Sequence, residues 1–511
     1  MAPSRGPATG WCHDKREARV TTIIVVTIIV VTLLGRTEAK GDGMADNRFV
    51  GRERELAMLD ERYGRDDQQT IVVYGRRRVG KTSLIRRFSQ DKPTLWFTAS
   101  ERSDENNRRE LALATARFFG EPDPIGAPPA WLDLLRYIAE KGRSFGKFIF
   151  VFDEFPYAAQ AEPSLPSAMQ IVLDHDFAEA GVFTILCGSN QGFMESEVLG
   201  SSSPLFGRRT AQIKLKPLPM AEAIELMPSN AAWQERFEYY AALGGTPYYL
   251  RQLAEGESFA GNMTALCFDE LGPLFDEPAM LLREELREPN VYRSVLEAIA
   301  HGETKAKGIA ERAGIAATSL QFYLKTLEEL GLARRDLPFG DRSAKSKKSQ
   351  YYITEPFFAY WFRFVAPSIG AIERGDGDAA AQLGTEGEVF DTYVGQQFEG
   401  ICQQWMLTER RAGRLDILPS QVGKWWGNDP ALREQADIDL IIEDDINGKM
   451  IFGECKWRNS LNATEAADLL RHRAELIDGP TDRQFYLFTK CEVPSIDGVT
   501  VVQAETMFGE H

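Results

Sequence analysis

The sequence has few cysteines, and none of them forms a closely spaced pair. Its 511 residues include six cysteines without a C-x-x-C motif, at positions Cys12, Cys187, Cys267, Cys402, Cys455 and Cys491. Zinc-binding modules and small disulfide-rich domains both depend on cysteines at short, regular spacings. The scattered pattern therefore argues against a zinc knuckle and against a disulfide framework, and it is typical of a protein in the reducing cytosol.

The sequence also lacks an excess of positive charge. Asp and Glu number 75 against 59 Lys and Arg, which gives a formal net charge of −16. Binding to a nucleic-acid backbone depends on clustered basic residues. A nucleic-acid footprint over the whole surface is thus excluded, and any such contact must be local. The hydrophobic content of 43% is that of a globular chain, and the length suits three or more domains.

The apolar run near the N-terminus, residues 20–34, is short for a membrane span. As a helix it would rise about 22 Å, against a hydrocarbon core of about 30 Å. Three interpretations stay open: translation begins at Met44, the run is a short membrane anchor, or it is signal-peptide-like without the usual cleavage site. We favour the Met44 start because the first recognisable domain follows directly. We therefore expect a cytoplasmic protein, with membrane anchoring through residues 20–34 as the alternative.

A phosphate-binding loop is the strongest motif in the chain. Residues 75–82 read Gly-Arg-Arg-Arg-Val-Gly-Lys-Thr and fit G-x-x-x-x-G-K-[ST], between a β-branched run and a helical apolar pattern. Gly75 and Gly80 permit the tight turn that points backbone N–H groups at phosphate oxygens, and the dipole of the next helix adds to the attraction. We expect Lys81 to reach the β- and γ-phosphates and the Thr82 hydroxyl to bind Mg²⁺.

Three consecutive arginines lie inside this loop. Guanidinium groups there suit an anionic ligand, although a solvated basic rim is the alternative. The predicted nucleotide contacts of the loop are Gly75, Arg76, Arg77, Arg78, Val79, Gly80, Lys81, Thr82 and Ser83.

A second apolar segment supplies the carboxylates that a magnesium-nucleotide site needs. Residues 147–154 form an unbroken apolar run that ends in Asp153 and Glu154, as expected for a central strand buried on both faces. Asp153 would bind Mg²⁺, and Glu154 would orient the attacking water. Two motifs in this order predict a P-loop NTPase, an α/β fold with a parallel sheet that uses ATP and Mg²⁺.

These motifs resemble those of a known family. Val50-Gly51-Arg52-Glu53 ahead of this phosphate loop is similar to the archaeal-type P-loop ATPases of prokaryotes, which are related to AAA+ and signal-transducing (STAND) NTPases. The resemblance implies that Gly51 and Arg52 lie near the adenine. It also implies a helical lid after the ATPase core.

The resemblance implies three further contributions to the ATPase site. Ser189 or Asn190, at the polar tip of another apolar run, would be the sensor near the γ-phosphate. Arg208 or Arg209, in a Leu-x-Gly-Arg-Arg pattern, would act as an arginine finger, with a surface salt bridge as the alternative. Pro247, in a Gly-Gly-Thr-Pro segment, would be the sensor of the lid and pack near the nucleotide.

The next segment has the pattern of a winged helix-turn-helix. Its predicted elements are helices over 291–300, 305–313 and 318–330, with Gly314 in a turn, and wing strands over 332–337 and 350–353. The loop between the strands is basic in an acidic protein. We expect contact with duplex DNA, while a protein-binding winged helix that serves as lid or hinge is the alternative. The candidate DNA contacts are Thr318, Ser319, Gln321, Lys325, Arg342, Lys345, Lys347 and Lys348.

An aromatic segment and a predicted linker follow the wing. Residues 355–364 resemble the aromatic junction of the family, with Glu355 in place of the usual Asp, and we expect them to pack between domains. Residues 370–385 are rich in Gly, Ala and acids, which predicts a linker.

The last part of the sequence carries a second group of carboxylates. Residues 436–442 predict a strand with alternating acids, Asn447-Gly448 predicts a hairpin turn, and residues 450–457 predict the returning strand. A strand period of two places Glu454 and Lys456 on one face.

This arrangement resembles the site of PD-(D/E)XK nucleases. The resemblance implies that Asp439 and Glu454 hold a Mg²⁺ that activates water, that Lys456 positions the water, and that Glu399 is the acid from a helix. Asp437 is an alternative ligand. An exposed, salt-bridged hairpin is the structural alternative, and a degenerate site without activity is equally compatible.

The sequence predicts six segments and leaves three functions open. The segments are an extension (1–44), an ATPase core (45–216), a helical lid (217–288), a winged helix-turn-helix (289–366), a linker (367–387) and an α/β restriction-endonuclease-like domain (388–511). The chain is an ATPase that gates a nuclease, a DNA-binding regulatory ATPase with an inert C-terminal domain, or a signalling ATPase that binds no nucleic acid. A homo-oligomer is one alternative for its assembly.

Overall fold

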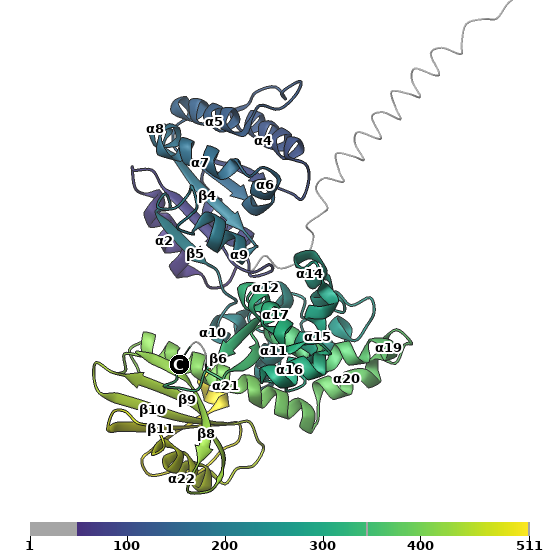
Figure 1. The fold of residues 1–511 in the computed structure, drawn as a ribbon, viewed down its shortest axis with the longest axis vertical. Coiled ribbons are helices and arrows are strands. Elements are labelled where there is room, and N and C mark those ends of the chain that lie inside the picture. Colours follow the sequence, from purple (N-terminus) through teal and green to yellow (C-terminus); the bar gives the residue numbers. More distant parts are fainter. Residues whose placement is uncertain (1–48, 344–345, 509–511) are drawn as a thin grey trace, which may run out of the picture. The chain divides into compact units, whose positions relative to one another are not determined.

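A computed structural model describes residues 49–343 and 346–508 (Figure 1). The apolar run at 20–34, the candidate start at Met44 and the predicted DNA contact Lys345 lie outside these residues. The chain from Phe49 onwards forms one compact unit. Within the described part of the chain, no helix is long and apolar enough to cross a membrane.

The first sheet has five parallel strands, which confirms the predicted α/β class. Their order is β2-β3-β4-β1-β5, and each neighbouring pair runs parallel. The bounds are β1 (Thr70–Tyr74), β2 (Thr94–Thr98), β3 (Phe148–Asp153), β4 (Val182–Gly188) and β5 (Ala211–Lys214). Every residue of β1, β3 and β4 is buried, which explains the unbroken apolar runs of these segments.

Two separate apolar cores cover the two faces of this sheet. Alternate residues of β1 divide between them, with Ile71 and Val73 in one core and Val72 in the other. The first core includes α2 (Glu53–Tyr63) and α3 (Lys81–Ser89). The second core includes residues of α4 (Asp104–Phe119), α5 (Trp131–Phe145), α6 (Phe155–Ala161), α7 (Leu165–Asp174) and α8 (Asp176–Ala180). The sheet is therefore covered on both faces, and its strand ends position the loops.

Helices predominate in the chain after β4. They are α9 (Gln191–Phe193), before β5, and then α10 (Met220–Ala223), α11 (Trp233–Leu243), α12 (Pro247–Leu250), α13 (Phe259–Cys267) and α14 (Glu277–Glu285). Short single-turn segments lie between some of them. Proline at the first turn of α12 and of α14 suits a helix start, because the missing N–H would have no partner inside the helix there.

Three helices and a two-stranded sheet come next, close to the predicted positions. They are α15 (Pro289–Ala300), α16 (Ala306–Ala313), α17 (Ala317–Glu329), β6 (Ala333–Asp336) and β7 (Gln350–Ile353). Gly314 ends α16 with a φ of 68°, the left-handed geometry that glycine adopts without strain. The two strands pair antiparallel. The loop 337–349 between them is called the wing loop below.

The predicted linker at 367–387 is wrong, because most of this stretch is helical. After α18 (Pro356–Tyr360) the chain forms α19 (Ile369–Ile372) and α20 (Gly377–Thr385). Ala380 and Ala381 are buried, and a Cβ at Gly384 would lie 2.9 Å from the Tyr360 hydroxyl. Small residues here serve close packing rather than flexibility, and alanine also favours helix.

The C-terminal part is a separate five-stranded mixed sheet with order β12-β11-β10-β9-β8. β8 with β9 and β9 with β10 are antiparallel, whereas β10 with β11 and β11 with β12 are parallel. The elements are α21 (Glu388–Arg411), β8 (Gln421–Asp429), β9 (Glu434–Asp444), β10 (Lys449–Lys456), α22 (Ala463–Ala474), β11 (Asp482–Thr489), β12 (Val499–Gln503) and α23 (Ala504–Met507). The two predicted strands with acids are β9 and β10.

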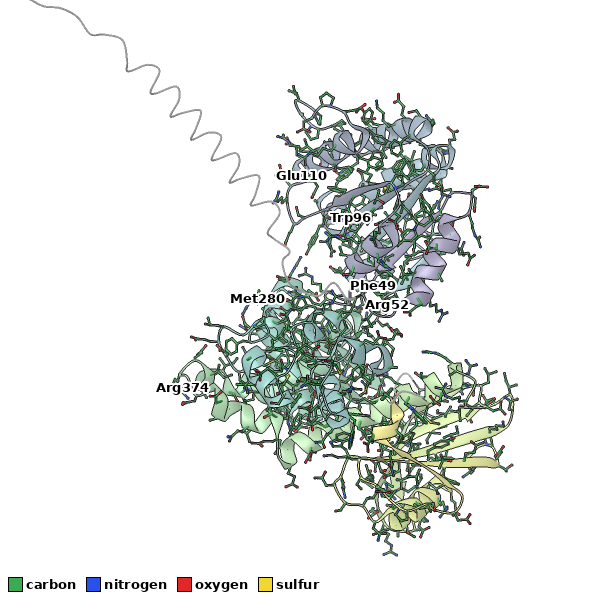
Figure 2. The ribbon with its side chains drawn as sticks, turned by 180° about the vertical axis from the view of Figure 1, so that it is seen from behind. Phe49, Arg52, Trp96, Glu110, Met280 and Arg374 are labelled. Carbon is green, nitrogen blue, oxygen red and sulfur yellow. The ribbon has the colours of Figure 1, made fainter. Side chains whose placement is uncertain are left out.

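One apolar core joins the segments after the first sheet. It includes residues from α11, from the three helices α15 to α17, from α18, and from α21 and β10; Figure 2 draws the side chains. The Phe237 ring of α11 lies 5.4 Å from the Trp457 ring, which follows β10. The Tyr393 hydroxyl of α21 donates to the Ala241 carbonyl at 2.8 Å. These segments therefore share one apolar core.

Candidate nucleotide site and C-terminal carboxylate site

The phosphate loop has the backbone geometry that the sequence predicts. It joins β1 to α3, and Gly75 has a φ of 152°. A Cβ at Gly75 would lie 2.3 Å from the Leu215 carbonyl oxygen, so another side chain would clash with the backbone after β5. Gly80 has a φ of 94° and precedes the first residue of α3. Pro247 Cγ lies 3.9 Å from the position of a Cβ at Gly80, which places Pro247 beside the loop.

Lys81 is buried at the start of α3 and folds back along the loop. Its Nζ donates to the Gly75 carbonyl at 2.8 Å and to the Arg76 carbonyl at 3.0 Å. Burial lowers the pKa of Lys81, and the nearby Cys187, Glu154 and Asp153 oppose this shift. The ammonium group is therefore held inside the loop by two neutral carbonyl acceptors. An anionic oxygen is a stronger acceptor and would replace them.

The two acids at the end of β3 lie in different environments. Asp153 is buried, its carboxylate accepts from the Glu154 N–H at 3.1 Å, and burial raises its pKa. Glu154 has a left-handed backbone with a φ of 51°. Its Oε2 accepts from the Ser189 N–H at 3.1 Å and from the Ser189 hydroxyl at 2.9 Å. Ser189, which follows β4, therefore fixes the orientation of the Glu154 carboxylate, the group that is predicted to orient water.

The structure distinguishes the two sensor candidates after β4. Ser189 contacts Glu154, as described above, whereas the Asn190 side chain accepts from the Phe193 N–H at 2.9 Å and caps α9. In the sheet order, β4 lies between β1 and β3. Ser189 is therefore the candidate that lies with the other predicted site residues.

Thr82 and Asp153 have the chemistry of a magnesium site. Mg²⁺ prefers oxygen ligands and is commonly held by one or two protein oxygens together with phosphates and water. Asp153 ends the strand beside β4, and Thr82 is the second residue of α3. A carboxylate has about four acceptor positions, so the hydrogen bond from Glu154 leaves capacity for a cation. A cation would also offset the cost of burying the Asp153 charge.

Two of the three loop arginines pair with buried carboxylates from outside the first sheet. Arg76 Nη1 lies 2.6 Å from Oε2 of Glu355, and the Arg76 guanidinium is 4.5 Å from the ring centre of Phe358. Arg78 Nε donates to Glu277 at 2.9 Å. Glu355 and Glu277 are 3% and 5% exposed. These pairs tie the phosphate loop to the segment before α18 and to the start of α14.

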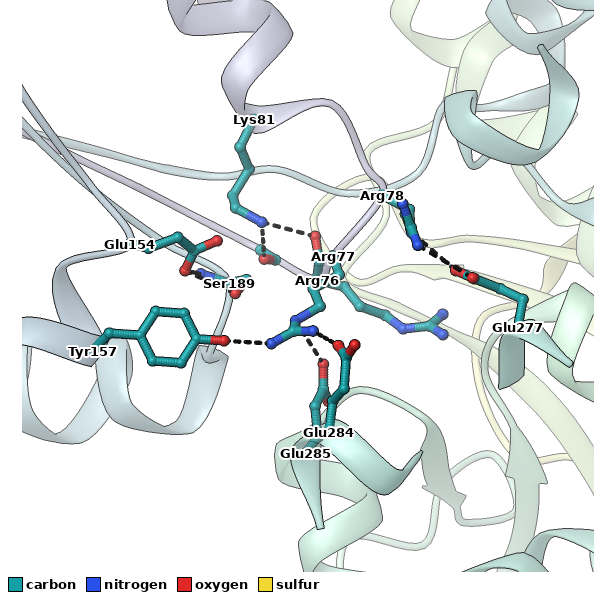
Figure 3. Close-up of polar contacts among 11 residues, drawn as sticks. Arg76, Arg77, Arg78, Lys81, Glu154, Tyr157, Ser189, Glu277, Glu284 and Glu285 are labelled. Carbon is teal, nitrogen blue, oxygen red and sulfur yellow. Dashed lines mark hydrogen bonds and ion pairs between the residues drawn. The ribbon is translucent and has the colours of Figure 1, made fainter. Parts of the chain in front are cut away.

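Arg77 has a different set of partners (Figure 3). Its Nη2 donates to the Tyr157 hydroxyl of α6 at 2.6 Å. Its guanidinium forms an ion pair with Glu284, and its Nε lies 3.5 Å from Oε1 of Glu285. The sequence predicted nucleotide contacts for all three arginines. In the structure each of them forms an ion pair with a carboxylate that was not predicted as a partner.

Arg52 supports the phosphate loop from the segment before α2. It is labelled in Figure 2, is 9% exposed and has a left-handed φ of 71°. Its Nη2 donates to the Val79 carbonyl of the loop at 3.5 Å and to the Lys216 carbonyl. Gly51 beside it has a left-handed φ of 65°, which favours glycine, and a Cβ there would displace the Glu222 carboxylate. Arg52 contacts the loop through the Val79 carbonyl, and contact of Gly51 or Arg52 with adenine stays a prediction.

The candidate arginine finger Arg208 forms a surface ion pair. Its Nε and Nη2 each lie 3.1 Å from an Asp174 carboxylate oxygen at the end of α7. Arg209 Nη1 donates to the Leu199 carbonyl at 3.5 Å. This geometry corresponds to the salt-bridge alternative for Arg208. A role for either arginine in catalysis stays a prediction.

The candidate DNA contacts on α17 share one property, which is exposure. They are Thr318, Ser319, Gln321 and Lys325, and the last pairs with Glu329 at 3.5 Å. The basic side chains of the wing loop, Arg342, Lys347 and Lys348, are also exposed. DNA contact through these residues stays a prediction.

The wing loop itself is held against the C-terminal sheet. The Phe339 N–H donates to the Lys424 carbonyl of β8 at 2.7 Å, and the Trp426 indole donates to the Lys348 carbonyl at 3.0 Å. Phe339 is 8% exposed within a core formed by β9, β10 and α22. The wing thus extends to the edge strand β8, a contact that the sequence did not predict.

The C-terminal carboxylates lie together on β9 and β10. The Cys455 N–H donates to Asp439 Oδ2 at 2.9 Å, and Lys456 forms an ion pair with Glu454, as their shared face predicts. Burial and the neighbouring Asp439 raise the pKa of Glu454 to about 7. Asp437, the alternative ligand, is 68% exposed and lies 3.4 Å from Arg473 Nη1. Two acids and one lysine are therefore close neighbours, as the resemblance implies.

Lys424 of β8 is a member of this cluster that the sequence reasoning missed. It forms an ion pair with Glu399 of α21. Burial lowers the pKa of Lys424, while Asp439 raises it and Arg334 of β6 lowers it. The sequence shows a lysine at position 424, but it does not show the order of strands in the sheet. That Lys424 lies on the strand beside β9 could therefore not be predicted. Among the described residues, no group of three or more His, Cys, Asp or Glu side chains is placed to hold a metal.

Comparisons with known proteins give the family. Residues 49–253 match a family described as an ATPase domain predominantly from Archaea, and residues 361–469 match one described as archaea bacterial proteins of unknown function. An uncharacterized protein of Methanocaldococcus jannaschii is 30% identical over 411 residues, which are 80% of this chain and 88% of that protein. The chain belongs to the archaeal-type P-loop ATPase family. The resemblance of residues 50–82 to archaeal-type P-loop ATPases is thereby confirmed, while the resemblance of the C-terminal carboxylates to a nuclease site stays a prediction.

Other similar proteins cover smaller parts or share less sequence with this archaeal-type ATPase. An uncharacterized ATP-binding protein of the same archaeon is 46% identical over 44 residues, which are 9% of this chain and 75% of that protein. A Walker-type ATPase of Pyrococcus abyssi is 21% identical with a TM-score of 0.48, over 63% of this chain and 99% of that chain. The match to the ATPase domain includes the whole parallel sheet and ends shortly after α12.

Proposed function

We propose that this archaeal-type ATPase binds ATP at the loop 75–82 and hydrolyses it with Mg²⁺. Lys81 would leave its two carbonyl partners for the β- and γ-phosphates, because a charged oxygen is a stronger acceptor than a carbonyl. Thr82 and Asp153 would hold Mg²⁺, which neutralises charge on the phosphates when bound. Glu154 would accept a hydrogen bond from the attacking water and hold it in line with the γ-phosphorus.

The observation that carries this proposal is the hydrogen bonding of Glu154 to Ser189. Two donors from the end of β4 hold one carboxylate oxygen at 2.9 and 3.1 Å. Lys81 lies within electrostatic reach of Glu154 and Asp153. Three adjacent strands, β1, β4 and β3, therefore present a lysine, a hydroxyl and two acids at the ends where ligands of parallel sheets bind.

The first test measures ATP affinity. Lys81→Ala removes a charge-assisted contact with phosphate, and we expect roughly tenfold to hundredfold weaker binding. The matched control is Lys92→Ala, because Lys92 lies just beyond the end of α3 and pairs with Asp60 at 3.0 Å. Calorimetric titration of the full chain with ATP and Mg²⁺ gives both affinities. Equal affinity for the two variants would contradict the proposal.

We also propose that the C-terminal cluster binds a divalent cation and cleaves a nucleic-acid phosphodiester. Asp439 and Glu454 would hold the cation, which lowers the pKa of its water when bound, and Lys456 would orient that water. The contact of the wing with this sheet favours a nucleic-acid substrate. Lys424 Nζ lies 6.0 Å from the ring centre of Tyr352 on β7. β7 directly follows the wing loop, which carries the exposed basic residues.

Glu454→Gln tests the second proposal, because it removes one ligand charge while preserving shape. We expect Mg²⁺-dependent nicking of plasmid DNA to be lost and ATP hydrolysis to persist. Glu492→Gln changes an acid on the same part of the chain and is the control. An intact chain that cleaves neither duplex, single-stranded nor branched DNA would contradict nuclease activity, and the regulatory or signalling alternatives would then hold.

A further inference from the structure

The ion pair between Arg77 and the end of α14 differs from the other two arginine pairs of the phosphate loop. Glu284 is 50% exposed and Glu285 is 21% exposed, whereas Arg77 is 25% exposed. The partners of Arg76 and Arg78, Glu355 and Glu277, are almost fully buried. Partly exposed ion pairs contribute little stability and exchange readily, whereas buried pairs are costly to break. Arg77 is therefore the loop arginine with the most exchangeable partners.

The carboxylates at the end of α14 lie within the electrostatic field of the proposed phosphate site. Burial raises the pKa of Glu285, Arg76, Arg77 and Lys81 lower it, and Glu154 raises it. The Arg77 guanidinium also reaches α6, the helix that follows Glu154 directly. A negative group from α14 thus stands near the same cations that would attract nucleotide phosphates (Figure 3).

We propose that Glu284 and Glu285 are an internal competitor for nucleotide phosphates at Arg77, so that the end of α14 is an autoinhibitory contact. Carboxylates and phosphates are both anions that pair with a guanidinium through charge-assisted hydrogen bonds. A bound phosphate that draws Arg77 towards itself breaks the ion pair with α14, and an intact ion pair weakens phosphate binding. This inference rests on the proposed ATP site.

The first turn of α14 stays anchored when the ion pair with Arg77 breaks. Only the last turn of the helix is then released. Glu277 at the first residue of α14 binds Arg78 through two hydrogen bonds, at 2.9 and 3.2 Å. The Arg78 guanidinium also lies 4.0 Å from the Tyr248 ring centre. Leu281 and Leu282 are buried. Release of Glu284 and Glu285 therefore frees the last turn rather than the whole helix.

This last turn leads directly into the three-helix segment. α14 ends at Glu285 and α15 begins at Pro289, so three residues separate the ion pair from the proposed DNA-binding helices. A ligand of α15 to α17 that pulls on this connection breaks the ion pair, removes the competing carboxylates from Arg77 and so raises ATP affinity. Coupling between two binding sites is reciprocal. ATP likewise changes the affinity of that ligand by the same factor.

The test compares ATP affinity of the full chain with and without the acidic groups. Glu284→Gln keeps the shape and removes one charge, and we expect about two- to fivefold tighter ATP binding. The double variant Glu284→Gln, Glu285→Gln is expected to bind more tightly still, and Glu284→Lys as well. The control is Asp276→Asn, because Asp276 precedes α14 and pairs with Arg283 at 2.6 Å, within the same segment. Adenosine, which lacks phosphates, is expected to bind all variants equally.

A second measurement uses the protein without nucleotide. The Leu286 N–H donates to the Leu282 carbonyl at 3.1 Å and closes the end of α14. We expect faster hydrogen exchange of this amide in the double variant than in the unmodified chain, and faster exchange in the unmodified chain when ATP is added. Unchanged exchange in the double variant overturns the proposal, and so does unchanged ATP affinity.

The two measurements separate this inference from the proposed ATPase function. If Lys81→Ala binds ATP as well as the unmodified chain does, the proposed ATP site fails, and the exchange measurement without nucleotide still decides whether the carboxylates hold α14. If Lys81→Ala weakens binding and the glutamine variants do not strengthen it, the ATP site holds and the autoinhibitory contact is wrong.

Discussion

Asp444 at the end of β9 shows at the residue scale how hydrogen bonds control one buried charge. Its carboxylate accepts from the Leu418 N–H and the Asn447 side chain, each at 2.7 Å, and from the N–H groups of Ile446 and Asn447. Burial alone would raise its pKa, but the bonds from Asn447, Leu418 and Ile446 prevail and lower the pKa to about 2. The Asp444 carboxylate in its charged form therefore stabilises the turn between β9 and β10.

This shift predicts a pH dependence of stability. Because the folded pKa is lower than the unfolded value of about 3.9, the carboxylate stabilises the fold above about pH 4 and loses this effect as the pH falls through about 2. Asp444→Asn is expected to lower the urea midpoint at pH 6, and the difference from the unmodified chain should shrink towards pH 2. Asp445→Asn, at the exposed neighbour, is the control. A constant difference across this range would contradict the assignment.

Residues of the two candidate sites differ in how far the sequence could predict them. Lys81, Asp153 and Glu154 could be predicted because each belongs to a short motif whose geometry is local. Glu284 and Lys424 were missed because their partners, Arg77 and Glu399, are distant in the sequence and meet them only after folding. Ser189 was one of two candidates, and the hydrogen bonds to Glu154 favour it.

At the scale of elements, one aromatic side chain packs the wing loop into the C-terminal core, in addition to the hydrogen bonds from Phe339 and to Lys348. Phe339 is 8% exposed and packs with Ile438, Met450 and Phe452. Phe339→Ala is expected to lower the free energy of unfolding by about 3–5 kcal/mol, because it removes a large buried ring and leaves a cavity. Urea unfolding followed by tryptophan fluorescence measures this loss.

The control for this prediction is a phenylalanine in a different environment. Phe322 on α17 is 66% exposed, and its replacement by alanine is expected to change stability by less than about 0.5 kcal/mol. If both alanine variants unfold at the same urea concentration, the wing does not anchor in the C-terminal core.

Strands and helices with a regular apolar pattern were predicted close to their observed positions. The helical stretch at 370–385 was not. The strands β1, β3 and β4 were visible as apolar runs, and the helices α15 to α17 as amphipathic stretches. The stretch at 370–385 was predicted as a linker because of its glycines and alanines. Part of this stretch forms the helix α20 instead, in which Ala380, Ala381 and Gly384 pack closely; small residues on a packed helix face have the same composition as a flexible linker.

At the scale of the whole molecule, the predicted segments after the first sheet do not each have a separate apolar core, whereas the first sheet has two cores of its own. The helices after the first sheet, the three-helix segment and the C-terminal sheet contribute to one core. The ring of Trp457 lies 5.2 Å from that of Phe398 on α21, and 5.4 Å from that of Phe237 on α11. Long-range packing of this kind cannot be inferred from composition. It also means that the C-terminal site is best tested in the full chain.

The central claim is that this archaeal-type ATPase hydrolyses ATP through Glu154, and the chemical state of the bound nucleotide tests it most directly. The full chain is incubated with ATP and Mg²⁺, the complex is isolated, and the ratio of ADP to ATP is measured over time. We predict that the unmodified chain converts its bound ATP to ADP. Glu154→Gln should bind ATP with similar affinity and convert it at least about a hundredfold more slowly. Bound ATP that stays intact in the unmodified chain, or equal conversion by Glu154→Gln, would contradict the account.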